Sequence, residues 1–337
     1  EFVKAWEAGL ELSLFKNRVG IEATYFHQDN TDQIIPIAVS SATGFTTATV
    51  NAASFTNEGF EFDLKLTPLI QLGDVRINFK GNATYNTSVV TSVYEGLDEV
   101  FAGGFNNFAA NFVVRNNPAF VFKATDYLRD DQGRVIVDQI TGEPSQDPNN
   151  KVFGRTMPLW IVGLNPTVSW KNLTFSVVGE YKGGHTAFHK IGDDMAWTGI
   201  SKATAVNHRE NFVFPNSSYE DPLNPGKYIA NTNVTLSNIN NFFTGVYRDV
   251  ASNFLTSAAA WRLREASISY DLPKKLLGSA KLIKAVSVSI TGRNLYLWLP
   301  KSNEYSDPDF NFTTGNTSGV GVSSINPPTR TYGASAV

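Results

Sequence analysis

The sequence predicts an all-β protein, an antiparallel transmembrane β-barrel present in part, with long extracellular loops. Residues 60–66 read Phe-Glu-Phe-Asp-Leu-Lys-Leu, and because a strand points successive side chains to opposite faces, one face is apolar and the other polar. The same alternation returns in about nine segments along the 337 residues. No stretch has the roughly 18 consecutive apolar residues of a membrane-spanning helix, whereas a barrel strand needs only about nine to eleven residues, half of them apolar.

The links between these segments are alternately short and long. We expect membrane strands over residues 6–15, 19–25, 58–69, 75–85, 159–170, 173–182, 260–272, 285–295 and 329–337. Short links follow the first, third, fifth and seventh of these strands, and long links follow the others. Outer-membrane barrels have short periplasmic turns and long external loops. The first strand should therefore begin at the outer surface and the last should end at the periplasm.

The long links have the polar, Asn-, Gly- and Pro-rich composition of surface loops. Residues 26–57 are predicted to form one such loop, and residues 120–127 and 134–138 are predicted to form a hairpin that stands above the barrel. Residues 185–257 contain no convincing strand, but short helices are predicted over 191–202 and 238–251. The last long link covers residues 300–328.

Composition alone describes an ordinary globular protein, with 42% hydrophobic and 18% charged residues and a mean hydropathy of -0.17. A formal charge of -3 offers no basic stripe for a phosphate backbone, so nucleic-acid binding is not expected. The absence of cysteine excludes disulfides, thiolate metal sites and cysteine nucleophiles, and it fits an oxidising envelope.

The alternation assigns side chains to the two faces of the barrel wall. The charged residues expected to face the lumen are Glu7, Glu11, Glu61, Asp63, Arg76, Lys80, Glu180 and Arg293. They are too many for a small packed interior, so the lumen should be wide and either wet or plugged. The aromatic residues expected to form interfacial girdles are Trp6, Phe60, Tyr85 and Tyr181 at the outer rim and Phe15, Trp170 and Tyr270 at the inner rim. The alternative is that strands favour aromatic residues in any setting.

Several segments occur in the order in which they are found in one known family. Residues 6–12 read WEAGLEL and residues 15–19 read FKNRV, followed by ATYF at 23–26 and DQI at 32–34. Residues 57–61 read NEGFE, residues 261–273 read WRLREASISYDLP, residues 292–295 read GRNL and residues 328–333 read PTRTYG. Together they resemble the C-terminal barrel portion of the SusC/RagA family of TonB-dependent outer-membrane transporters.

The resemblance implies that residues 1–337 are the C-terminal part of one 22-stranded barrel domain and contain about nine of its strands. The other thirteen strands, together with a signal peptide, an N-terminal extension and a plug, are expected upstream. It also implies active import of bulky nutrients, oligosaccharides or peptides, across the outer membrane of a Gram-negative bacterium. The implied partners are a SusD-like surface lipoprotein, the TonB complex through the N-terminal part, outer-membrane lipid, and a second transporter–lipoprotein pair in a homodimer. No cofactor is implied.

No catalytic or metal site is predicted. His185 and His189 have an i, i+4 spacing but no third ligand nearby, and turn chemistry explains the aspartates in residues 126–133 better than a calcium loop does. No phosphate-binding loop, nucleophile elbow or Ser/His/Asp arrangement is present, so an enzyme is not expected.

Seven aromatic residues in or near the loops are candidates for stacking on sugar rings or gripping apolar peptide side chains: Phe188, Trp197, Tyr219, Phe242, Phe243, Tyr247 and Trp298. The alternative is that they pack the loops together or against a lid.

Two other classes of protein remain open at this point. A passive porin or a metal-chelate receptor would share the barrel. A soluble β-sandwich, such as an adhesin or a carbohydrate-binding protein, would also alternate apolar and polar residues, but it would bury its apolar face in a core.

Overall fold

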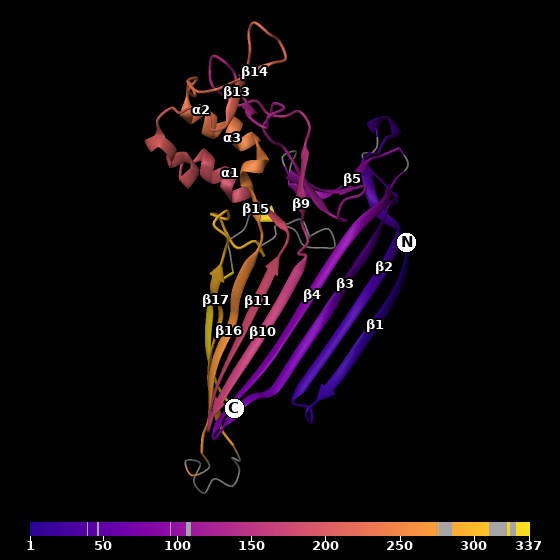
Figure 1. Ribbon diagram of the computed structural model, residues 1–337, viewed down its shortest axis with the longest axis vertical. Helices are drawn as coiled ribbons and strands as arrows, with labels where there is room; N and C mark the ends of the chain where they lie inside the picture. The colour runs from indigo at the N-terminus through magenta and orange to yellow at the C-terminus, as the bar shows by residue number, and fades with distance from the viewer. Residues whose placement is uncertain are drawn as a thin grey trace.

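The computed structural model describes residues 1–38, 40–45, 47–94, 96–105, 109–273, 275, 285–309, 322–323 and 328–337. They form two regions, a sheet of nine long strands and a group of shorter elements above one end of it (Figure 1). We call the sheet the wall. We call the elements above it the cap, which comprises the described parts of residues 39–46, 94–159, 184–259, 299–309 and 322–323.

All nine wall strands are antiparallel to their neighbours and follow one another in chain order, as the sequence predicts. Their bounds are β1 Phe2–Leu14, β2 Val19–Ala38, β3 Thr47–Leu72, β4 Val75–Val93, β10 Trp160–Trp170, β11 Leu173–Gly183, β16 Ala260–Asp271, β17 Ser287–Trp298 and β19 Thr331–Ala336. The short turns and the C-terminus lie at one end of the wall, and the N-terminus and the cap lie at the other (Figure 1). The predicted direction of each strand is confirmed, but the link lengths do not alternate strictly: eight residues separate β2 from β3, where a long link was predicted, and fifteen separate β16 from β17, where a short one was predicted.

The wall has no hydrophobic core. Among the residues described, every buried hydrophobic side chain except Ala260 lies in the cap or on the ends of β3 and β4 that project toward it. The wall instead exposes large apolar side chains, such as Leu10 at 57%, Ile268 at 50% and Ile290 at 64% relative accessibility. A β-sandwich would bury these side chains between two sheets, so this arrangement is that of part of a barrel wall.

Strands β2 and β3 continue far beyond the ends that the sequence predicts. They pair from Val19 and Leu66 up to Ala38 and Thr47, so the predicted loop over 26–57 is wrong. The connection is residues 39–46, which include the 3₁₀ turn η1 Ser41–Thr43. The projecting ends are stabilised by packing, because Ala52, Ala53, Val90 and Val93 form a buried cluster with Val100 and Val113 of the cap.

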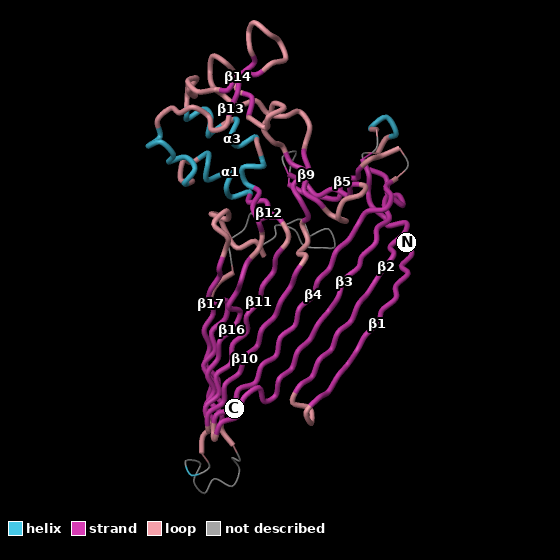
Figure 2. Tube along the Cα trace, viewed as in Figure 1, coloured by secondary structure: helices cyan, strands magenta, loops and turns pink. Residues whose placement is uncertain are grey.

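The cap contains three small sheets (Figure 2). One consists of β5 Glu99–Phe105, β6 Ala109–Val114, β7 Val121–Ala124 and β9 Lys151–Arg155. The second consists of β8 Val135–Ile136, β13 Ser217–Glu220 and β14 Tyr228–Ala230, and the third of β12 Thr186–His189, β15 Leu255–Ser257 and β18 Val322–Ser323. The predicted hairpin of 120–127 with 134–138 is present only at its tip, where Arg129 and Val135 form an antiparallel bridge. Further from the tip the prediction is wrong, because β7 pairs with β6 and β9 while β8 pairs with β13.

Helices occur where the sequence predicts them, within the third long link. They are α1 Lys190–Trp197, η2 Lys202–Arg209, α2 Ile239–Thr244, α3 Val246–Asp249 and η3 Ala251–Phe254. None of the helices in the described residues has the length and apolar character needed to cross a membrane. Four short strands, β12 to β15, also lie in this link, where no strand was predicted. Each has at most four residues, which is too short for alternation to be recognised.

Candidate functional site

The polar face of the wall is the candidate functional surface. The eight charged residues expected to face the lumen all lie on it, because cross-strand partners share a face and each strand alternates. The register aligns Glu11 with Glu22, Glu22 with Asp63, and Asp63 with Asn82 across four strands. That these residues face a closed lumen stays a prediction.

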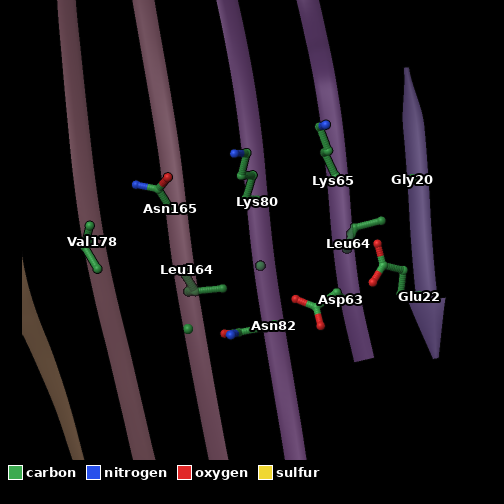
Figure 3. A pocket seen from close by; sticks show the side chains of 12 residues that line it. Gly20, Glu22, Asp63, Leu64, Lys65, Lys80, Asn82, Leu164, Asn165 and Val178 are labelled. Atoms are coloured by element: carbon green, nitrogen blue, oxygen red, sulfur yellow. The ribbon is translucent and has the colours of Figure 1, made fainter. Parts of the chain in front are cut away.

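A hollow of about 600 Å³ lies on this face (Figure 3). Its charged lining residues are Glu22, Asp63, Lys65 and Lys80. Gly163 also lines it, and a Cβ atom there would come 2.2 Å from Oδ1 of Asn82, so a larger residue at this position would require the Asn82 side chain to move. No oppositely charged group lies within 4.0 Å of any of the four charged groups in the described residues. The hollow therefore presents both signs of charge to whatever enters it.

Toward the turns the same face carries mainly uncharged polar side chains, with Arg76 as a charged member. One cross-strand row runs from Arg76 through Ser169, Thr174, Ser269 and Ser289 to Ser335. Neighbouring hydroxyls in this row hydrogen-bond to one another, with 3.2 Å between Ser169 and Thr174 and 2.8 Å between Ser289 and Ser335. This end of the face is thus lined mainly by hydroxyl groups.

Near the cap, six charged side chains form a compact group that we call the charge cluster. Its members are Glu180, Lys182, Arg262, Arg264, Asp307 and Asp309. Arg262 is only 3% exposed; its Nη2 donates to Asp307 over 2.7 Å and its Nε lies 3.3 Å from Asp309. Arg264 contacts both Glu180 and Asp309.

The charge cluster fastens the segment after β17 to strands β11 and β16. Burial acts to raise the pKa of Asp309, but the cations of Arg262, Lys182 and Arg264 outweigh it and hold that pKa below the ordinary value. Asp309 is therefore ionised at neutral pH. Three cations and three anions balance, so the cluster ties two elements together without adding net charge to the upper part of the polar face.

A β-bulge in the motif at residues 261–273 makes the charge cluster possible. Adjacent residues Val178 and Gly179 of β11 pair with Glu265 and Leu263, so Arg264 is an extra residue opposite β11. A bulge of this kind re-aims side chains, and here Arg262, Arg264 and Glu265 all reach charged partners on the polar face. The signal in the sequence is the adjacent charged pair Arg264 and Glu265, which interrupts the alternation of the strand.

The apolar face carries a belt of aromatic rings at the cap end of the wall. Ring centroids lie 5.3 Å apart for Trp6 and Tyr25, 5.3 Å for Phe60 and Tyr85, and 5.0 Å for Tyr181 and Trp261. Trp160 and Tyr296 also belong to this belt and were not predicted. Trp298, which the sequence analysis treated with the loop aromatics, is the last residue of β17 and lies beside Tyr296 in register with Trp261.

The three aromatic residues expected at the opposite rim lie near the turns. Leu173 pairs with both Trp170 and Tyr270, so these two share one cross-strand row. Phe15 is 75% exposed in the turn after β1. Lys171 lies over the ring of Trp170 at 5.4 Å.

Of the candidate loop aromatics, three are buried. Phe188 and Phe242 are each 2% exposed and Phe243 is 6% exposed. The prediction that they contact a ligand is corrected, because their rings pack inside the cap. Tyr247 packs partly against the same clusters. Trp197 is 59% exposed and Tyr219 is half-buried, so for these two a ligand contact stays a prediction.

The two histidines of the i, i+4 pair have different surroundings. His189 is fully buried and its Nε2 lies 2.8 Å from Oγ1 of Thr256. Burial lowers the pKa of His189 to about 4, and burial is also the main reason that the pKa of His185 falls to about 4. In the described part of the chain, no group of three or more His, Cys, Asp or Glu side chains is arranged to hold a metal ion.

The acidic loop at residues 126–133 is organised as a turn. Oδ1 of Asp130 accepts hydrogen bonds from the backbone N–H groups of Gln132 and Arg134, and Oδ2 accepts from Nε of Arg134 and the hydroxyl of Ser218. Burial opposes ionisation, but these hydrogen bonds outweigh it and lower the pKa of Asp130 to about 2. Its oxygens are fully used within the protein.

Comparison with known proteins gives one curated relative and several solved structures. No family model matches the chain. The TonB-dependent receptor P26 of Formosa agariphila is 20% identical over 320 residues, which cover 88% of this chain and 30% of the relative. A structure of the RagAB peptide transporter aligns with a TM-score of 0.67 at 17% identity, over 99% of this chain and 34% of that one.

A second RagAB structure, in a closed-closed state, aligns with a TM-score of 0.68 at 17% identity and also covers 99% of this chain. The chain spans about a third of the length of these proteins. The predicted resemblance to SusC/RagA-type TonB-dependent transporters is confirmed. The fold is that of a partial outer-membrane β-barrel.

Proposed function

We propose that this chain forms the C-terminal part of the wall, and the extracellular cap above it, of a TonB-dependent outer-membrane importer of bulky nutrients. The observation that carries the proposal is that one face of the wall is apolar and uncovered while the other is polar. The apolar face, with its aromatic belt, has no protein packed on it among the described residues, and a lipid bilayer is the environment that such a face requires. The polar face is then left for the lumen.

The polar face suits the passage of large polar cargo. Its hollow of about 600 Å³ presents unpaired charges of both signs, and the rows below it carry hydroxyls that bind and release hydrogen-bonding groups weakly. Oligosaccharides and peptides are the two cargo classes that fit such a surface. The similarity in fold to the RagAB peptide transporter supports peptides as the cargo.

We further propose that a SusD-like surface lipoprotein covers the cap. The surface around α1 exposes Ile191 at 38%, Trp197 at 59% and Ile200 at 72%. At the tips of the cap, Ile140 and Leu223 are 89% and 87% exposed. Large apolar side chains grouped on an otherwise polar surface are typical of protein contacts. Assembly with the TonB complex and pairing into a homodimer belong to the same proposal, and both depend on the whole transporter.

A passive porin is the second candidate function, and it is separated from the first by energy dependence. Deletion of the gene in its host should abolish uptake of fluorescently labelled peptides or oligosaccharides too large for a porin. Addition of a protonophore to the wild type should have the same effect within minutes. Uptake that continues undiminished after the proton gradient is collapsed would contradict active import and would favour the porin.

Membrane location is tested separately from transport. The full-length protein should fractionate with the outer membrane and should need detergent to stay in solution. A protein that remains soluble without detergent would overturn the barrel proposal itself, whatever the result of the uptake assay.

A further inference from the structure

A second, smaller hollow of about 310 Å³ lies where the wall meets the cap. The wall contributes Thr84 and Asn86 of β4 and Phe55 of β3. The cap contributes Phe120, Arg155 and Met157. This volume is at the lower end of the range found for small-molecule sites, which is roughly 300–1,000 Å³. We call it the Arg155 pocket.

Arg155 is held in place by two residues of β4. Its Nη1 donates to the carbonyl oxygen of Asn86 over 3.1 Å, and its Nη2 donates to Oγ1 of Thr87 over 3.0 Å. These contacts use two of the five N–H donors that a guanidinium carries. The position of the group is therefore fixed before any ligand arrives.

Arg155 differs from the arginines of the charge cluster in having no acidic partner. Arg262 and Arg264 each contact at least two carboxylates. No carboxylate lies within 4.0 Å of Arg155 in the described residues, although its side chain is half-buried. A half-buried guanidinium remains charged at any physiological pH and gains from an anion that can approach it.

The residues that line the Arg155 pocket indicate which class of anion it would bind. Arg155 is the one charged side chain among the described residues that line it; the others are neutral polar or apolar. A single positive charge balances a carboxylate, whereas a phosphate dianion would leave one negative charge unpaired in a partly buried site. The rings of Phe55 and Phe120 and the thioether of Met157 offer apolar contacts to the rest of the ligand.

We propose that the Arg155 pocket binds the carboxylate end of an amphipathic ligand, with the guanidinium on the carboxylate and the apolar part of the ligand against Phe55, Phe120 and Met157. This inference rests on the proposed function, because it identifies the ligand as a part of the imported cargo.

The test compares two probes that differ in one charge. N-acetyl-L-phenylalanine has a carboxylate, and N-acetyl-L-phenylalaninamide has the same size and ring but no charge. Binding of each is measured by isothermal titration calorimetry to the detergent-purified full-length transporter. We expect the carboxylate to bind about tenfold more tightly, the ratio given by one hydrogen-bonded ion contact. Equal affinity for the two probes would overturn the inference.

Variants at Arg155 locate the effect. The substitution Arg155→Gln should reduce the affinity ratio to about one while amide binding is retained, and Arg155→Lys should keep part of the preference because the charge remains. The matched control is Lys227→Gln, which removes an exposed cation of the cap outside the pocket and should leave the ratio unchanged. A preference that persists in Arg155→Gln, or that disappears in Lys227→Gln, would contradict the assignment.

Folding and transport are kept separate from this result. Heat-modifiable mobility in gel electrophoresis reports whether each variant retains its barrel. The binding assay needs neither TonB nor a proton gradient, so a protein that discriminates between the probes but does not transport would contradict only the proposed function. A protein that transports but does not discriminate would contradict only the Arg155 pocket.

Discussion

The wall exposes its apolar side chains, whereas the cap buries its own. In the wall the apolar face is exposed over its whole width, and Leu10, Ile268 and Ile290 have no core to enter. In the cap, Phe122, Phe188 and Phe254 meet from three distant parts of the chain and are at most 2% exposed. The wall is thus built for a solvent of lipid, and the cap is built like a small water-soluble protein.

This difference predicts that the two regions respond to different substitutions. The wall should tolerate changes on its polar face and fail when charge is placed on its apolar face. The cap should be sensitive to the loss of any large buried side chain, because its cores are small.

The largest effect is expected from Phe242→Ala in the cap. The ring of Phe242 is 2% exposed and lies 4.9 Å from Phe243 and 5.6 Å from Tyr247, measured between ring centroids. Its removal should lower the free energy of unfolding of the cap by about 3–5 kcal/mol. Limited proteolysis should cut the cap rapidly while the barrel keeps its heat-modifiable mobility. Trp197→Ala, at an exposed ring, is the control; loss of the barrel in Phe242→Ala would show that the two regions do not fold separately.

The next effect is expected from Leu64→Arg in the wall. Leu64 pairs with Ile21 on the apolar face, and an arginine in the middle of a lipid-facing surface costs about 2–4 kcal/mol. The adjacent substitution Asp63→Arg places the same side chain on the polar face and should cost much less. Urea unfolding of the full-length protein in lipid vesicles measures both. Equal costs would mean that the apolar face does not contact lipid.

A smaller effect is expected from Arg262→Gln at the junction of the two regions. The charge-assisted hydrogen bond from Arg262 to Asp307 should be worth about 1.5–3 kcal/mol. Hydrogen exchange of backbone amides in residues 303–309 should accelerate. Arg293→Gln removes a pair with Glu265 in which the arginine is 67% exposed, and such a pair is worth only about 0–1 kcal/mol. Similar exchange in both variants would mean that the charge cluster does not hold the segment.

The smallest effect is expected from a change in pH, counted as the change in the free energy of unfolding of the cap per pH unit. The pKa of His189 is lowered from 6.5 to about 4 in the folded cap, so the unfolded cap binds more protons between these values. The contribution of His189 to the stability of the cap is therefore fully present above about pH 6.5 and is lost toward pH 4, by at most about 1.4 kcal/mol per pH unit. Proteolysis of the cap should be faster at pH 5 than at pH 7.5, and His189→Gln should weaken this dependence. A dependence of the opposite sign would contradict the burial of a neutral imidazole.

The wall could be predicted from sequence because each of its strands obeys a local rule. A strand between lipid and water alternates whatever its neighbours are, so residues 60–66 were sufficient to place Glu61 and Asp63 on one face. The extra residue Arg264 was missed because a bulge breaks that rule, and the projecting ends of β2 and β3 were missed because Thr, Ser and Ala in 38–54 occupy both faces.

The cap could be predicted only in outline. Helices α1 and α2 lie in the predicted windows, since helical periodicity is also local. Which aromatic rings are buried depends on contacts between segments far apart in the chain, as for Phe122 and Phe254. The Arg155 pocket has the same origin, because its guanidinium is fixed by two residues of β4 that lie 68 and 69 positions away in the sequence.

The length of β3 has a mechanical consequence. Its 26 residues span about 86 Å at roughly 3.3 Å per residue, and only about nine to eleven of them are needed to cross the bilayer. Because β2 and β3 remain hydrogen-bonded almost throughout, they form one stiff ribbon from the membrane to the outer surface. A small tilt of this ribbon within the membrane displaces its far end in proportion to that length, which couples the inclination of the strands to the position of the outermost residues.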